Sequence, residues 1–231
     1  IRNKLRYFYL TCITIIAVNF IHCLDSGEVL EKVKSKHIRK YLEAKKDTVD
    51  SGLSELDEIC PGVSEKLEDA VINFLECADK VDDSLTICEA IQSATLNCTQ
   101  PLIKLVDDCL PAKAKGLPSL GINSFRSVSE YLCKQSGESL FELLNPCLWE
   151  DAEDSSATAQ CERDLETRMD KFVNGTSLPS TTEVCSFATS VRNCLKLDGE
   201  KSCKNQKTRE VALGLVDAIV APCSAINEVD S

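Results

Sequence analysis

The chain is poor in the residues that most catalytic sites need. It has two histidines in 231 residues, and it lacks the Gly-x-Ser-x-Gly, glycine-rich phosphate-loop and His-Glu-x-x-His motifs. His37 lies in EVLEKVKSKHIRKYLEAKK, a charged amphipathic pattern with no nucleophile motif nearby. Ile38 follows it, so the His-Asp pair of a secreted phospholipase is missing as well. We therefore predict a non-enzyme with no catalytic residues.

Paired metal ligands are also missing. No Cys-x-x-Cys occurs, and the most closely spaced cysteines, Cys185, Cys194 and Cys203, are separated by eight residues each. Structural zinc sites draw their ligands from closer pairs. The formal net charge of −11 argues against a nucleic-acid partner. We predict no metal, no cofactor and no nucleic-acid ligand.

Residues 1–23 have the pattern of a cleavable signal peptide. An apolar run over residues 7–21, broken by three polar residues, is too short to span a bilayer comfortably, and charged sequence replaces it soon afterwards. Cleavage near Cys23 is expected. The basic residues that precede the run are Arg2, Lys4 and Arg6. The sequence therefore predicts a secreted, extracellular protein without a stable membrane anchor.

The remaining chain divides by its cysteine content. Residues 24–58 are predicted to form a charged helical leader without cysteine, residues 59–225 a cysteine-rich helical domain, and residues 226–231 a tail. Cleavage removes Cys12 and Cys23 and three basic residues, which takes the charge from −11 to −14. An even number of cysteines remains in an oxidising compartment, as six disulfides would require. Those expected to be bridged are Cys60, Cys77, Cys88, Cys98, Cys109, Cys133, Cys147, Cys161, Cys185, Cys194, Cys203 and Cys223.

Hydrophobic spacing predicts helices throughout the cysteine-rich part. In VSEKLEDAVINFLECADK the apolar residues recur at helical spacing, and strand-type alternation never persists. Breakers predict loops over 111–121 and 174–180, and Ser124 is expected to cap a helix. Pro101 is expected at an early helical position. The chain is predicted to be all-α, with helices over about 62–79, 84–97, 101–110, 138–148, 155–173, 182–196 and 207–221.

The cysteine ladder suggests a duplication. The intervals are 16, 10, 9, 10 and 23 residues in the set over 60–133, and 13, 23, 8, 8 and 19 in the set over 147–223. In each set two short intervals precede a long one that is filled by a predicted helix. If one unit gave rise to both halves, each should use the same internal connectivity, and no bridge should join the halves. A single array stapled wherever neighbours meet is the alternative.

The ladder also carries a family resemblance. CKQSGESLFELLNPC, then Cys161, CSFATSVRNCLKLDGEKSC and ALGLVDAIVAPC resemble the insect 27 kDa haemolymph glycoprotein family, over roughly residues 60–223. A nematode family of secreted helical proteins has a similar ladder. The resemblance implies an extracellular glycoprotein of body fluid without an established enzymatic activity, and it supplies no catalytic residues.

Two functions from different classes remain open at this level. One is a non-enzymatic haemolymph-type glycoprotein with a binding or interaction role and an unknown partner. The other is a secreted helical carrier of a small apolar ligand, although the Cys-x-x-x-Cys pair of odorant-binding proteins is missing. Two glycosylation sequons occur, at Asn174 and Asn97. Asn174 is the better acceptor because it lies in a polar loop.

Overall fold

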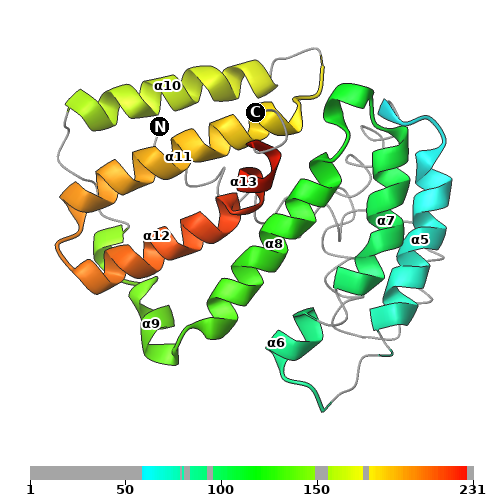
Figure 1. The fold of residues 1–231 in the computed structure, drawn as a ribbon, viewed down its shortest axis with the longest axis horizontal. Helices are drawn as coiled ribbons and strands as arrows, with labels where there is room; N and C mark the ends of the chain where they lie inside the picture. Colours follow the sequence, from blue (N-terminus) through cyan, green and yellow to red (C-terminus); the bar gives the residue numbers. More distant parts are fainter. Residues whose placement is uncertain are drawn as a thin grey trace. The chain divides into compact units, whose positions relative to one another are not determined.

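A computed structural model describes residues 59–78, 80, 84–92, 96–148, 156–173 and 177–227 (Figure 1). Every regular element in these ranges is helical, so the predicted all-α, disulfide-stapled fold is confirmed. The predicted signal peptide at 1–23, the leader at 24–58 with His37, and Asn174 lie outside the described residues.

The chain divides into two compact units. The boundary falls between Phe125 and Arg126, inside helix α8 (Leu117–Lys134). The first unit contains the described residues up to Phe125, and the second contains those from Arg126 onward. Each unit is treated separately below.

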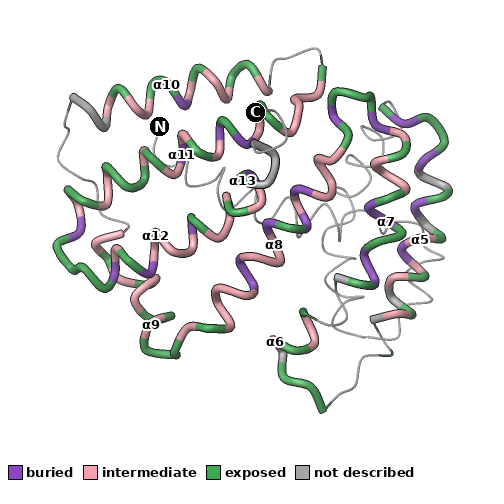
Figure 2. Tube along the Cα trace, in the orientation of Figure 1, coloured by how far each residue is buried: buried purple, intermediate pink, exposed green. Residues whose placement is uncertain are grey.

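Two helices form most of the first unit. α5 (Val63–Ala78) buries Val63, Leu67 and Val71, which lie four residues apart and so share one face. α7 (Leu96–Cys109) lies beside α5 and buries Leu102 and Ile103 (Figures 1 and 2). The periodicity had predicted α5 closely.

Other boundaries in this unit differ from the sequence-based expectation. The helix expected over 84–97 starts later, at Ile87, as α6 (Ile87–Ala90), and a π-helical turn follows at 91–92. Thr86 and Glu89 cap its start with a reciprocal pair of hydrogen bonds. Glu89 accepts from the Thr86 amide and hydroxyl, and these bonds lower the pKa of its carboxyl group. α7 begins before Pro101, so the expectation that this proline opens a helix was wrong.

The predicted loop over 111–121 is largely structured. Ala112–Ala114 form a 3-10 turn, η2, and Gly116 has a φ of 86°, a value that glycine adopts without strain. The Gly116 amide donates to Asp107 Oδ1 over 2.5 Å, and α8 begins at the next residue. The prediction that Ser124 caps a helix was therefore wrong: Ser124 is buried inside α8. Pro118 had suggested a loop, but the first turn of a helix tolerates proline.

The second unit contains a row of three longer helices. α10 (Ser156–Val173), α11 (Thr181–Ser202) and α12 (Gln206–Val220) follow one another side by side (Figure 1). Smaller elements accompany them: α9 (Gly137–Glu142), the 3-10 turn η3 (Pro146–Leu148) and α13 (Pro222–Asn227). The expected ranges of α10 and α12 are correct to within one residue.

α11 starts as its sequence predicts but ends later. Ser180 and Glu183 form a capping box, in which the Ser180 hydroxyl accepts from the Glu183 amide over 3.1 Å. The expected end was near residue 196, but the helix continues to Ser202. Its first half buries Cys185, Phe187 and Val191, and its C-cap residue Cys203 is fully buried and bridged to Cys147, so tertiary contacts stabilise both ends.

All twelve cysteines from Cys60 onward are disulfide-bonded. The first set contains Cys60–Cys109 and Cys77–Cys98, and the second contains Cys147–Cys203, Cys161–Cys194 and Cys185–Cys223. Cys88 and Cys133 are the third and sixth cysteines of the first set. The first-to-fifth and second-to-fourth bridges thus occur in both sets, as a duplication would require.

Candidate functional site

Helix α9 exposes an apolar face. Phe141 is 72% exposed, Leu144 in the turn that follows is 70% exposed, and Leu140 is 38% exposed. Residues three and four apart lie on the same side of a helix, so these three side chains form one surface. We call Leu140, Phe141 and Leu144 the α9 patch.

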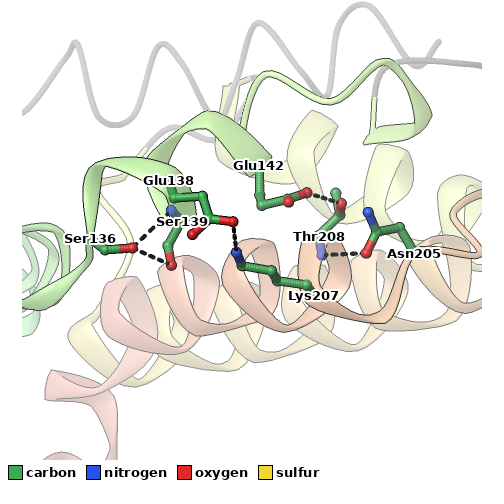
Figure 3. A network of polar contacts seen from close by, with 7 residues as sticks. All are labelled: Ser136, Glu138, Ser139, Glu142, Asn205, Lys207 and Thr208. Carbon is green, nitrogen blue, oxygen red and sulfur yellow. Dashed lines mark hydrogen bonds and ion pairs between the residues drawn. The ribbon is translucent and has the colours of Figure 1, made fainter.

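The opposite side of α9 faces α12 with polar groups. Thr208, near the start of α12, is completely buried, and its hydroxyl donates to Glu142 Oε2 over 2.5 Å (Figure 3). The Asn145 amide group donates to the same hydroxyl oxygen over 3.2 Å. The Thr208 backbone amide in turn donates to the Asn205 side chain, which caps α12. Hydrogen bonds between side chains therefore orient α9 on α12.

An ion pair borders the patch. Lys207 Nζ lies 3.0 Å from Glu138 Oε1, and the exposed fractions of the two side chains are 44% and 83% (Figure 3). Glu138 and Phe141 are three residues apart, so the carboxylate lies beside the exposed ring. The Ser136 hydroxyl accepts from the Ser139 amide and caps the start of α9. The edge of the patch thus carries one charge of each sign.

A disulfide holds the segment that follows α9. Cys147 in η3 is bridged to Cys203, the C-cap residue of α11, which is fully buried. Arg209 donates from Nη1 to the Cys203 carbonyl oxygen over 2.5 Å. α9 is therefore fixed near both ends, by its cap and the ion pair at the start and by the bridge after its end.

The amphipathic pattern of α9 is inverted relative to that of an ordinary surface helix. Short helices usually bury their apolar side and expose their charges. Burying one Phe or Leu side chain contributes about 1.5–3 kcal/mol, and the α9 patch leaves most of that contribution unused. Its side chains expose roughly 300 Å², the size of the largest apolar patch on many monomers, which is often functional. This arrangement suits a contact with another molecule.

Another polar arrangement in the second unit surrounds Tyr131. Its hydroxyl donates to the Val211 carbonyl oxygen over 2.8 Å, and its ring lies where a Cβ on Gly214 would be. Burial, together with the negative charge of Asp217, raises the pKa of Tyr131. Arg192 on α11 pairs with Asp217 on α12. The Tyr131 contacts locate α12 against the 126–134 part of α8, and the ion pair joins α12 to α11, so we assign them a structural role.

The predicted glycosylation site Asn97 lies in the first turn of α7. Its side chain is exposed, whereas Cys98 is bridged to Cys77 and Thr99 is fully buried. A glycan at Asn97 would therefore extend from the surface, but the Thr99 hydroxyl of the sequon is inaccessible in the folded unit. Modification would have to precede the packing of α7.

The α9 patch was not predicted from the sequence. Leu140, Phe141 and Leu144 resemble core residues of the helix expected over 138–148, and nothing local distinguishes them. The residues that turn the polar side of α9 inward, Lys207 and Thr208, lie more than sixty positions away. Among the described residues, no cluster of His, Cys, Asp or Glu could hold a metal ion.

The chain has no match among known protein-family models, curated proteins or solved structures. In the part of the chain that the structure describes, no helix has both the length and the apolar content needed to cross a membrane.

Proposed function

We propose that the chain is a secreted, non-enzymatic protein that binds a partner through the α9 patch. The observation that carries this proposal is the inverted amphipathic pattern of α9. Its polar side is hydrogen-bonded to α12, while Phe141 and Leu144 remain exposed. A partner that covered the patch would recover the burial free energy that the isolated chain leaves unused.

Two features support secretion. Residues 1–23 have the pattern of a signal peptide, and all twelve later cysteines are disulfide-bonded. Disulfides persist in oxidising compartments and are rare in the cytosol. We propose modification at Asn174 and, before α7 packs, at Asn97.

The haemolymph-type assignment rests on the cysteine ladder and its resemblance to the insect 27 kDa haemolymph glycoprotein family. That assignment agrees with a binding role, because the resemblance implies no enzymatic activity. The carrier alternative would place an apolar ligand between helices. The α9 patch favours a contact on the outer surface instead.

Hydroxyl-radical footprinting tests the binding role without assuming a partner. The protein would be labelled in its native fluid and again after purification and high dilution. We expect the oxidation rate of Phe141 to be several-fold lower in the fluid, while Leu85, an exposed leucine of the first unit, serves as the reference. Equal rates at Phe141 in the two samples would refute the proposed function.

A further inference from the structure

We propose that the α9 patch binds the α9 patch of a second copy of this chain, around a two-fold axis. This inference rests on the proposed function and names the partner. In a two-fold contact the same surface is used on both sides, so the surface must be complementary to itself. The α9 patch meets this condition in both its apolar centre and its charged edge.

The edge charges give the contact its complementarity. Glu138 and Lys207 lie side by side at the patch, and both side chains retain exposed surface. A two-fold axis through the apolar centre can place Glu138 of one copy against Lys207 of the other, and the reciprocal pair then forms as well. Each copy thus supplies one charge of each sign.

The charge of the whole chain limits where two copies can meet. The formal net charge is −11, and −14 after the expected cleavage of residues 1–23, so two copies repel each other overall. The α9 patch combines an apolar centre with a balanced pair of charges, and two copies can approach there without a net repulsion from the contact residues. The same negative charge opposes an anionic membrane as the occupant.

The size of the patch sets the expected strength. Two patches of roughly 300 Å² each, with part of their edge, give a contact below the roughly 1,200 Å² of a standard stable interface. Such contacts belong to the weak, transient class. We therefore expect a dissociation constant in roughly the micromolar-to-millimolar range rather than a permanent dimer.

Sedimentation equilibrium of the secreted, disulfide-bonded full chain tests the inference over roughly 10 μM to 1 mM, a range set by the expected affinity. We expect a monomer–dimer equilibrium that Phe141→Glu weakens at least about tenfold, because central aromatic residues dominate such contacts. Leu85→Glu is the matched control, since it places the same charge on an exposed leucine of the other unit. Circular dichroism would confirm that both variants remain folded.

Charge complementation makes the test specific to a two-fold contact. Glu138→Lys and Lys207→Glu should each weaken self-association, because each places like charges opposite one another. An equimolar mixture of the two variants should associate again, since both reciprocal pairs are then restored between unlike chains. Association of the mixture with a mass of two chains would support the two-fold geometry.

Three outcomes would overturn the inference: a monomer at every concentration, a dimer that Phe141→Glu leaves unchanged, or a mixture that fails to associate. A monomer whose Phe141 is still protected in native fluid would show that α9 binds another partner. In that case the proposed function stands and the two-fold contact fails. Binding of the monomer to phosphatidylcholine vesicles through Phe141 would likewise replace the second copy as the occupant.

Discussion

The two cysteine sets have the first-to-fifth and second-to-fourth pairings in common, but these disulfides connect different kinds of elements in each set. In the first set, Cys77–Cys98 joins the end of α5 to the start of α7, and Cys60–Cys109 joins the segment just before α5 to the end of α7. In the second set, the third, fourth and fifth cysteines all lie on or at the end of α11. There each bridge leads to a different element: η3, α10 or α13.

Helical geometry explains this arrangement. Nine residues make about two and a half turns, so Cys194 lies on the opposite face of α11 from Cys185 and Cys203. It is bridged to α10, while the other two are bridged to α13 and η3. In the first set Cys98 and Cys109 are eleven residues apart, about three turns, and share a face toward α5. Two sets of cysteines can therefore have the same pairing order even though their disulfides connect different helices.

The largest expected effect comes from removing Cys161–Cys194 by Cys161→Ala with Cys194→Ala. No other bridge within the described part of the chain joins α10 to α11, so we expect a loss of about 3–4 kcal/mol in the free energy of unfolding. Hydrogen exchange should show early loss of protection in α10, and urea unfolding measures the loss.

Cys77→Ala with Cys98→Ala is the comparison within the first set. Cys60–Cys109 still joins the segment just before α5 to the end of α7, so a smaller loss is expected and the amides of α5 should stay protected. If α5 in this variant lost as much amide protection as α10 does in the Cys161/Cys194 variant, the expected difference between the two sets would be wrong.

The next effect concerns α12, which has no cysteine between Gln206 and Val220. Gly214→Ala places a Cβ 2.5 Å from the Tyr131 hydroxyl oxygen, so overpacking should destabilise the protein by about 1–3 kcal/mol. Gly199→Ala in α11 is the control, because nothing lies within 4 Å of its Cβ. That variant should instead gain about 0.5–1 kcal/mol from helix propensity. Thermal unfolding of both variants checks the opposite signs.

A smaller loss in the free energy of unfolding is expected when the N-cap side chain of α11 or α12 is removed, and it should differ between the two helices. Asn205→Ala removes the acceptor for the amide of Thr208, a fully buried residue whose hydroxyl also bonds Glu142, so we expect a loss of about 1–2 kcal/mol. Ser180→Ala should cost only about 0.5 kcal/mol, because Cys185–Cys223 restrains the start of α11. A larger loss for Ser180→Ala than for Asn205→Ala in urea titrations would show that the bridge does not substitute for the cap.

The smallest expected effect is a pH dependence from Tyr131. Burial and the charge of Asp217 raise its pKa above the ordinary value of about 10, so its contribution to stability is complete below the unfolded pKa. That contribution is lost as the pH rises through the folded pKa, because the ionised hydroxyl cannot donate to Val211. Tyr131→Phe should therefore flatten the fall in unfolding midpoint above about pH 10. A variant with the same alkaline slope as the parent chain would exclude this role.

Much of the fold could be predicted from local patterns. The stripe of α5 and the ranges of α10 and α12 follow from apolar spacing and terminal residues. The start of α8 could not, because Pro118 is as compatible with a first helical turn as with a loop. Its start follows Gly116, whose amide bonds to Asp107, a contact made only after the chain has folded.

The α9 patch could not be predicted, for a related reason. Leu140, Phe141 and Leu144 are apolar residues in a helical pattern, and burial is the default expectation for such residues. Their exposure follows from the bonds that Thr208 and Lys207 make to the polar side of α9. Which face of a short helix turns inward is thus decided by residues distant in sequence.

The alternating bridges of α11 have a consequence for cleavage of the chain. Cys147–Cys203 and Cys185–Cys223 overlap in sequence, so a single cut anywhere between Cys147 and Cys223 is spanned by at least one of them. A protease that cuts once in this region leaves a nicked molecule whose pieces stay covalently joined. Such a molecule keeps its mass on a non-reducing gel and separates into fragments only after reduction. Release of fragments by a protease then requires reduction of the disulfides as well as cleavage of the chain.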